Sequence, residues 1–153
     1  FTRDGIGSLI NSEEGVLFVE MAALDNNLSS NKIISLSDGT TSNRLLIYYT
    51  NIDNTIKWFS QVGGSIQVDE GVVLSDITQF SKIAFKYKLN DYSLWVDGVE
   101  VGSYTSASSF PADTLNSLAL DDGGGASKFF GKVKQLQVYD TALTDEQIIQ
   151  ISK

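Results

Sequence analysis

The sequence predicts an all-β fold, a jelly-roll β-sandwich of two antiparallel sheets that ends in a short helix. Three observations support this prediction. Apolar and polar residues alternate with a period of two over much of the chain. Gly, Asn, Asp and Ser separate these runs at short intervals, and the chain has one proline, Pro111. With 153 residues, the chain is expected to form one domain that buries about 70% of its unfolded surface.

Ten segments show the alternation of a strand, and short strands at such spacing favour a sandwich over an α/β fold. In chain order, the predicted strands are residues 16–22, 32–35, 44–49, 55–61, 65–68, 82–88, 93–96, 100–104, 117–120 and 131–139.

One helix is predicted, at the end of the chain. Thr144-Asp145-Glu146-Gln147 has the form of a capping box, in which a hydroxyl residue is followed by Gln three positions later. Ile148, Ile149 and Ile151 follow. We therefore expect a short helix that docks an apolar side on the sandwich.

Composition excludes several classes of site. The chain has no cysteine, which excludes disulfides, thiol catalysis and cysteine-bound zinc. It has no histidine, which excludes an imidazole base and histidine-bound metals. The net charge of −8 makes nucleic acid and anionic membranes poor partners, and no apolar run approaches the roughly 20 residues of a membrane span.

The segment 82–97 is expected to form a hairpin that turns at Asn90-Asp91. One face of this hairpin is apolar and faces the core; it holds Ile83, Phe85, Tyr87, Leu94 and Val96. Trp95 falls on the other face with three lysines, directly opposite Lys86. Since lysine is almost never fully buried without a partner, Trp95 is placed on the wetter, outer face of the sheet.

Two interpretations of Trp95 stay open. In the first, the indole lies over lysine stems or beneath a loop and shields the sheet. In the second, the indole is an exposed platform for the apolar face of a sugar ring, and Lys86 and Asp97 bind the hydroxyl groups.

Trp58 receives two conflicting predictions. A loop at residues 51–54 places Trp58 in the core, with Tyr48, Lys57 and Phe59 facing outward. A hairpin that turns at Gly63-Gly64 pairs Trp58 with Asp69 and buries Phe59 instead. The two agree only if a β-bulge intervenes. Trp58 and Tyr48 are therefore further candidates for sugar binding.

Five segments together resemble the laminin-G-like, concanavalin A-like jelly roll of lectins and carbohydrate-binding modules. They are GVLFVE at 15–20, KIAFKY at 82–87, SLWVDG at 93–98, FGKV at 130–133 and VYDTALTDE at 138–146. The resemblance covers nearly the whole chain, and it is greatest to domains of bacteriophage tail fibres, other virion proteins and secreted marine bacterial proteins.

The resemblance implies two stacked sheets, one of them concave, that bind glycans on the concave sheet or at the loop rim, with calcium at the rim in some members. The family often has an Asp after the Gly-Lys pair that precedes the last strand. Here Gly131-Lys132-Val133-Lys134 is followed by Gln135, which weakens a calcium site of that type. Asp121 and Asp122, in a Gly-rich loop, are candidates for binding calcium or sugar hydroxyls, or are solvated turn acids.

Catalysis is not expected. Glycoside hydrolases of this fold typically carry two carboxylates on one strand in an E-x-D-x-x-E pattern, and no Glu-x-Asp occurs here. The acidic pairs are adjacent residues, which point to opposite faces of a strand. Glu20 lies in mid-strand between Phe18 and Ala22, but alone it makes no catalytic pair.

Three functions therefore stay open. The first is a non-catalytic module that binds a polysaccharide or cell-surface glycan, with a preference for a neutral glucan and no required cofactor. The second is a structural or protein-interaction jelly roll in a virion fibre or another extracellular assembly. The third is a polysaccharide hydrolase or lyase with an unfamiliar site. Because the chain begins Phe1-Thr2-Arg3 and its only methionine is Met21, we expect a module of a longer extracellular or virion protein, which could oligomerise through that parent.

Overall fold

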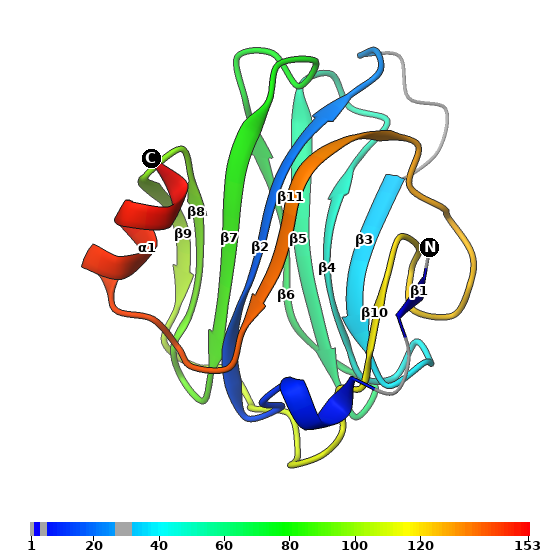
Figure 1. Cartoon of the computed structure of the whole chain (residues 1–153), viewed down its shortest axis with the longest axis vertical. Coiled ribbons are helices and arrows are strands. Elements are labelled where there is room, and N and C mark those ends of the chain that lie inside the picture. Colours follow the sequence, from blue (N-terminus) through cyan, green and yellow to red (C-terminus); the bar gives the residue numbers. More distant parts are fainter. Residues whose placement is uncertain (1, 4–5, 27–31) are drawn as a thin grey trace.

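The computed structural model describes residues 2–3, 6–26 and 32–153 and has the predicted fold, a sandwich of two antiparallel sheets (Figure 1). In spatial order, the six-stranded sheet consists of β1 (Thr2–Arg3), β10 (Ser117–Ala119), β3 (Lys32–Ser37), β4 (Arg44–Tyr49), β5 (Thr55–Val62) and β6 (Ser65–Val73). The five-stranded sheet consists of β11 (Gly131–Tyr139), β2 (Glu14–Ala23), β7 (Ser81–Lys88), β8 (Tyr92–Val96) and β9 (Val99–Tyr104). A 3-10 turn, η1 (Gly7–Leu9), precedes β2, and α1 (Asp145–Ser152) follows β11.

All ten predicted strands are present, and β4 and β11 have the predicted bounds. The largest difference is β6, which continues to Val73 because its partner β5 offers pairing positions as far as Thr55. The short β1 was not predicted from the sequence, since two residues show no periodicity. Among the described residues, no helix is long and apolar enough to cross a membrane.

The core lies between the sheets and takes every second side chain of each strand. Trp58 of β5 is fully buried there and meets Phe85 of β7 edge to face, with ring centroids 5.2 Å apart. The conflict over Trp58 is resolved by a β-bulge between Ser60 and Gln61. It lets Trp58 and Val68 both face the core while Phe59 faces outward, so Trp58 is a core residue and not a sugar-binding one.

The β7–β8 hairpin turns one residue earlier than predicted. The turn residues are Leu89 and Asn90, closed by a 2.9 Å hydrogen bond from the Asp91 amide to the Lys88 carbonyl. Asn90 takes the left-handed conformation, with φ 57°, which asparagine tolerates better than most residues. The shift moves the register by two, so Trp95 lies opposite Ala84 and not Lys86. Each side chain keeps its predicted face, because strand faces also repeat every two residues.

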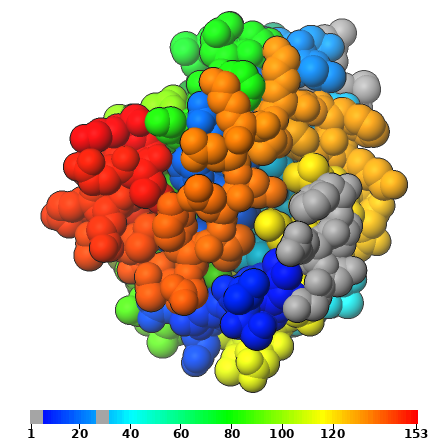
Figure 2. Space-filling view, in the orientation of Figure 1, coloured from blue at the N-terminus to red at the C-terminus, as the bar shows by residue number. Residues whose placement is uncertain are grey.

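The capping box predicted at the start of the helix is confirmed. The Thr144 hydroxyl accepts a hydrogen bond from the Gln147 amide, and the Gln147 side chain accepts one from the Thr144 amide. The apolar side of α1 packs on the outer face of the five-stranded sheet, where Ile148 is fully buried. In Figure 2, the red helix lies at the left of the molecule, beside the orange segment that precedes it in the chain.

Candidate functional site

Trp95 does lie on the outer face of its sheet, as predicted, but α1 covers it. The indole is only 6% exposed and packs with Val16, Phe18, Ala84 and Ile148. Its ring nitrogen donates to the Ser93 hydroxyl at 3.0 Å. The interpretation of Trp95 as an exposed sugar platform is therefore wrong, because a second, smaller hydrophobic core surrounds the ring.

The two residues expected to assist Trp95 are also engaged elsewhere. Lys86 is buried, and its ammonium nitrogen lies 2.9 Å from Asp91 and 3.8 Å from Asp145 at the start of α1. Asp97 is in the Asp-Gly turn between β8 and β9, where its carboxylate accepts the Lys82 amide at 2.8 Å. Lys86 therefore tethers the helix and Asp97 closes a hairpin, so neither faces an open sugar site.

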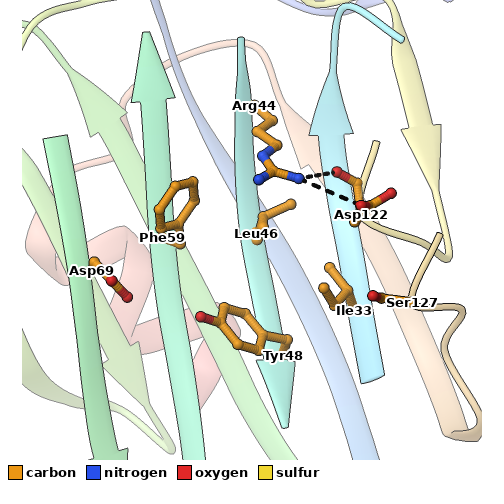
Figure 3. Close-up of a pocket in the computed structure, with 8 residues that line it drawn as sticks. All are labelled: Ile33, Arg44, Leu46, Tyr48, Phe59, Asp69, Asp122 and Ser127. Carbon is orange, nitrogen blue, oxygen red and sulfur yellow. Dashed lines mark hydrogen bonds and ion pairs between the residues drawn. The ribbon is translucent and has the colours of Figure 1, made fainter. Parts of the chain in front are cut away.

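An open hollow lies instead on the outer face of the six-stranded sheet. It has a volume of about 270 Å³ and lies between β6 and the loop of residues 121–128, which follows β10 (Figure 3). Its floor is apolar and consists of Ile33, Leu46, Tyr48 and Phe59, which pack together as a separate cluster on strands β3 to β5. Its polar rim consists of Arg44, Asp69, Asp122 and Ser127.

The floor forms because period-two alternation places side chains outward on three neighbouring strands. Leu46 lies beside Phe59 in the register of β4 and β5, and Ile33 lies beside Tyr48 in that of β3 and β4. Tyr48 and Phe59 are each only 9% exposed, yet both line the hollow. Tyr48, predicted to face outward, does so and belongs to this site.

Arg44 connects the sheet to the loop. One guanidinium nitrogen donates to the Asp122 carbonyl at 2.7 Å and lies 3.7 Å from the Asp122 carboxylate. The guanidinium carbon lies 5.4 Å from the centre of the Phe59 ring, a cation–π distance. The Arg44 Nε atom is buried and has no hydrogen-bond partner among the described residues. The side chain is therefore held at the edge of the hollow between the Asp122 loop and the Phe59 ring.

Asp69 lies at the opposite side of the hollow (Figure 3), and it forms an ion pair with Lys57. The hydrogen bond to Asp69 raises the pKa of Lys57, so the ammonium group stays charged to higher pH. Burial raises the pKa of Tyr48, and the nearby Lys57 charge opposes part of that rise. Across neutral pH the site therefore offers the neutral phenol of Tyr48 near the charged Lys57.

Asp121 and Asp122 both lie in the loop, but they perform different tasks. The Asp122 carboxylate accepts the Gly124 and Ala126 amides at 3.0 and 2.9 Å, which shapes the loop, and it faces the hollow. Asp121 is 8% exposed and accepts the Gly123 amide at 2.8 Å. Within the described ranges, no group of three acidic side chains could hold a metal ion. Asp122 therefore lines the hollow and pairs with Arg44, whereas its role toward calcium or a sugar stays a prediction.

Sequence reasoning did not assign six of the lining residues to a site: Ile33, Arg44, Leu46, Phe59, Asp69 and Ser127. Alternation did contain a signal for two of them, because Arg44 and Leu46 share their strand face with Tyr48. Phe59 was outward in only one of the two conflicting predictions, and the bulge that decides between them is not detected by period-two counting.

The apolar floor and the polar rim of the hollow together suit a ligand that is apolar on one face and rich in hydroxyl groups at its edges. The floor can contact C–H groups, while the guanidinium donates and the carboxylates accept hydrogen bonds. A sugar ring has this composition.

Comparison with known proteins identifies the family. A family model described as the concanavalin A-like lectin/glucanases superfamily matches residues 19–149. No curated protein matches the sequence significantly.

Solved structures share the fold at low identity. The CBM40 domain of the Ruminococcus gnavus IT-sialidase, bound to α2,3-sialyllactose, superposes with a TM-score of 0.75 at 18% identity, covering 97% of this chain and 88% of that one. Domain 4 of a Geobacillus stearothermophilus extracellular GH43 arabinanase, in complex with arabinotriose, gives 0.64 at 16%, covering 96% and 69%. The SAP-like pentraxin of Limulus polyphemus gives 0.69 at 16%, covering 94% and 71%.

Proposed function

Since the chain belongs to the concanavalin A-like lectin/glucanase superfamily, we propose that it is a non-catalytic carbohydrate-binding module whose ligand lies in the hollow of the six-stranded sheet. One observation carries the proposal: an apolar floor with two aromatic rings is bordered by two pairs of oppositely charged side chains. Two structural neighbours carry a glycan in their names, sialyllactose and arabinotriose.

Binding would use two kinds of contact. One sugar ring would lie against Tyr48 and Phe59, which removes apolar C–H surface from water. Arg44 would donate to ring or hydroxyl oxygens, while Asp69 and Asp122 would accept from hydroxyl groups. The hollow, at about 270 Å³, is close to the lower limit of about 300 Å³ for small-molecule sites, so it suits one or two sugar residues.

The charges of the hollow favour a neutral sugar. Arg44 is paired with Asp122 and Lys57 with Asp69, so the four side chains sum to zero. An anionic sugar would have to displace a carboxylate from one of these pairs, whereas a neutral sugar can bond to both partners at once. The chain as a whole carries −8 and repels anions further.

The same pairing supports binding without catalysis. Glycoside hydrolysis needs one carboxyl group to donate a proton and another to attack or to activate water. In the hollow, Asp69 bonds to Lys57, and the Asp122 carboxylate bonds to two loop amides. Neither is poised for such a role.

Affinity at one site would be weak, in the range of about 1 mM to 1 μM. Display of several copies on a larger extracellular or virion protein would raise the apparent affinity without new contacts. In that setting the oligomeric state of the parent protein would determine how many copies of the module are displayed together.

The test is affinity electrophoresis through a panel of polysaccharides, followed by calorimetry with 3′-sialyllactose, lactose, arabinotriose and cello- and laminari-oligosaccharides. We expect a neutral glycan to bind and Arg44→Met to weaken it at least tenfold. Lys134→Met is the matched control, because Lys134 also lies over an aromatic ring, 4.0 Å from the centre of Phe80, and beside a carboxylate, Glu20 at 3.4 Å, on the other sheet.

Each outcome decides between the candidates. Tighter binding of sialyllactose than of lactose would overturn the neutral preference and keep the site. Binding that survives Arg44→Met unchanged would move the site elsewhere. No binding to any glycan would overturn the proposal and favour a structural or protein-interaction module.

A further inference from the structure

A second hollow lies on the outer face of the same sheet, on the far side of the 121–128 loop, and we propose that it binds a second sugar residue of the same glycan. The inference rests on the proposed function and extends it from one sugar to an oligosaccharide. The hollow has a volume of about 260 Å³ and is lined by the β10 residues Ser117 and Ala119, by Gly39 and Asp121, and by Gly123–Gly125.

The loop runs over β3 from Ser37 to Ile33 and lies between the two hollows. Asp122 is bonded to Arg44 of β4, and Lys128 forms a bridge with Ile33 of β3. Between them, Gly123 lies so close to β3 that a Cβ atom there would be 2.9 Å from that of Ser37, and its φ is 88°. Glycine lets the backbone pass this low over the sheet, so the loop forms a shallow divider without large side chains.

The sheet register shows how close the hollows are. β3 pairs with β10 on one side and with β4 on the other, so Ser35 lies between Ala119 of the second hollow and Leu46 of the first. Two strands that flank a third are about 10 Å apart. A disaccharide or trisaccharide can span this distance across the divider.

Ser35 is also a polar group without a partner between the two hollows. Its side chain is fully buried, and its hydroxyl has no hydrogen-bond partner within the described part of the chain. Buried hydroxyl groups are normally paired with protein or an ordered molecule. Ser35 lines neither hollow, so a small occupant beneath the divider, such as a water molecule, is what would pair with its hydroxyl.

The second hollow has the chemistry of a hydroxyl acceptor. Asp121 is buried, and one of its oxygens accepts the Gly123 amide, which fixes the carboxylate toward the hollow. Among the described side chains, no cation is paired with Asp121, in contrast to Asp69 and Asp122. The carboxylate therefore accepts hydrogen bonds from neutral hydroxyl groups and repels an anionic sugar. The small side chains of Ser117 and Ala119 leave room for the ring.

The experiment is calorimetry with sugars of increasing length: glucose, cellobiose and cellotriose, laminaribiose and laminaritriose, and arabinotriose. In the unmodified protein we expect the best disaccharide or trisaccharide to bind at least about tenfold more tightly than its monosaccharide. Asp121→Asn keeps the shape of the side chain and should remove most of this gain while leaving monosaccharide affinity unchanged. Asp113→Asn, an exposed turn acid with φ 58°, is the matched control.

A second variant protects the test against a folding defect of the loop. Ala119→Val fills the second hollow without touching the bond between Asp121 and Gly123, and it should also reduce the gain with length. Equal affinities for monosaccharide and trisaccharide, or a gain that survives both variants, would overturn the second site and leave the proposed function intact. Failure of every sugar and every polysaccharide to bind would overturn both.

Discussion

The outer face of the five-stranded sheet carries Trp95 beneath α1, whereas the outer face of the six-stranded sheet carries Tyr48 and Phe59 beside an open hollow. Both faces present aromatic and apolar side chains at alternating strand positions, and both include a lysine in an ion pair. They differ in what the chain places above them, a docked helix on one and a glycine-rich loop on the other. An outward aromatic residue is therefore available to a ligand only where the covering segment leaves space.

The largest expected difference between the faces is between alanine variants of Trp95 and Tyr48: the first should mainly lower stability, and the second should mainly weaken glycan binding. Trp95→Ala should lower the free energy of unfolding by about 3–5 kcal/mol, because it leaves a cavity under α1, and should leave the glycan affinity of the folded protein unchanged. Tyr48→Ala should lower stability less, by about 1–3 kcal/mol, and should weaken glycan binding at least about tenfold. Urea unfolding followed by circular dichroism measures the first quantity, and calorimetry measures the second.

The same two variants can also contradict the assignment of the ligand to the face of Tyr48. If Trp95→Ala weakens glycan binding while stability is retained, α1 opens in solution and the covered face is the functional one. Tryptophan fluorescence gives an independent check, because Trp58, the other tryptophan, is fully buried, so emission at the longer wavelength of an indole in water would come from Trp95.

The tyrosines sharpen the contrast between enclosed and open positions. Burial raises the pKa of Tyr92 from the usual value near 10 for tyrosine to about 12, so the neutral phenol is favoured in the folded state. Its contribution of about 2–3 kcal/mol is present below pH 10 and is lost as the pH rises from 10 to 12. Unfolding in urea across this range should show a steep loss of stability, which Tyr92→Phe reduces.

Tyr48→Phe is the matched variant on the open face. In the unmodified protein burial also raises the pKa of Tyr48, but the Lys57 charge opposes that rise. Tyr48→Phe should therefore reduce the alkaline loss of stability by less than Tyr92→Phe does. An equal reduction would mean that the hollow is as closed to water as the core.

Much of this architecture could be predicted from the sequence because strand faces repeat every two residues. The face of Trp95, the outward position of Tyr48 and the bounds of β4 all follow from alternation. That α1 covers Trp95 could not be predicted, because the two meet through packing between segments that are distant in the sequence. The hollow was also hidden, since only the bulge after Ser60 decides between the two conflicting predictions for Phe59, and since Arg44 and Asp122, which are in contact, are 78 positions apart.

A smaller effect is expected from the helix cap that helps to keep the first face covered. Thr144→Ala removes the hydroxyl that accepts the Gln147 amide and should lower stability by about 1 kcal/mol. Thr141→Ala, an exposed residue just before the helix, should change stability much less. Thermal unfolding of the two variants measures the difference, and equal values would show that the cap does not hold α1 on the sheet.

The smallest change in stability is expected when Lys86 or Lys57, each in an ion pair, is replaced. These two variants should therefore differ in glycan affinity and not in stability. Lys86 is buried between Asp91 and Asp145, so its ion pairs gain attraction but lose hydration. Lys86→Met keeps the packing of the stem and should change stability by less than about 1 kcal/mol, because both carboxylates reach solvent and need no buried partner.

Lys57→Met should likewise change stability little, but it frees Asp69 and alters the charge beside Tyr48. Calorimetry should therefore show a severalfold loss of glycan affinity for Lys57→Met and none for Lys86→Met, and the opposite ranking would place the ligand on the helix side of the sandwich.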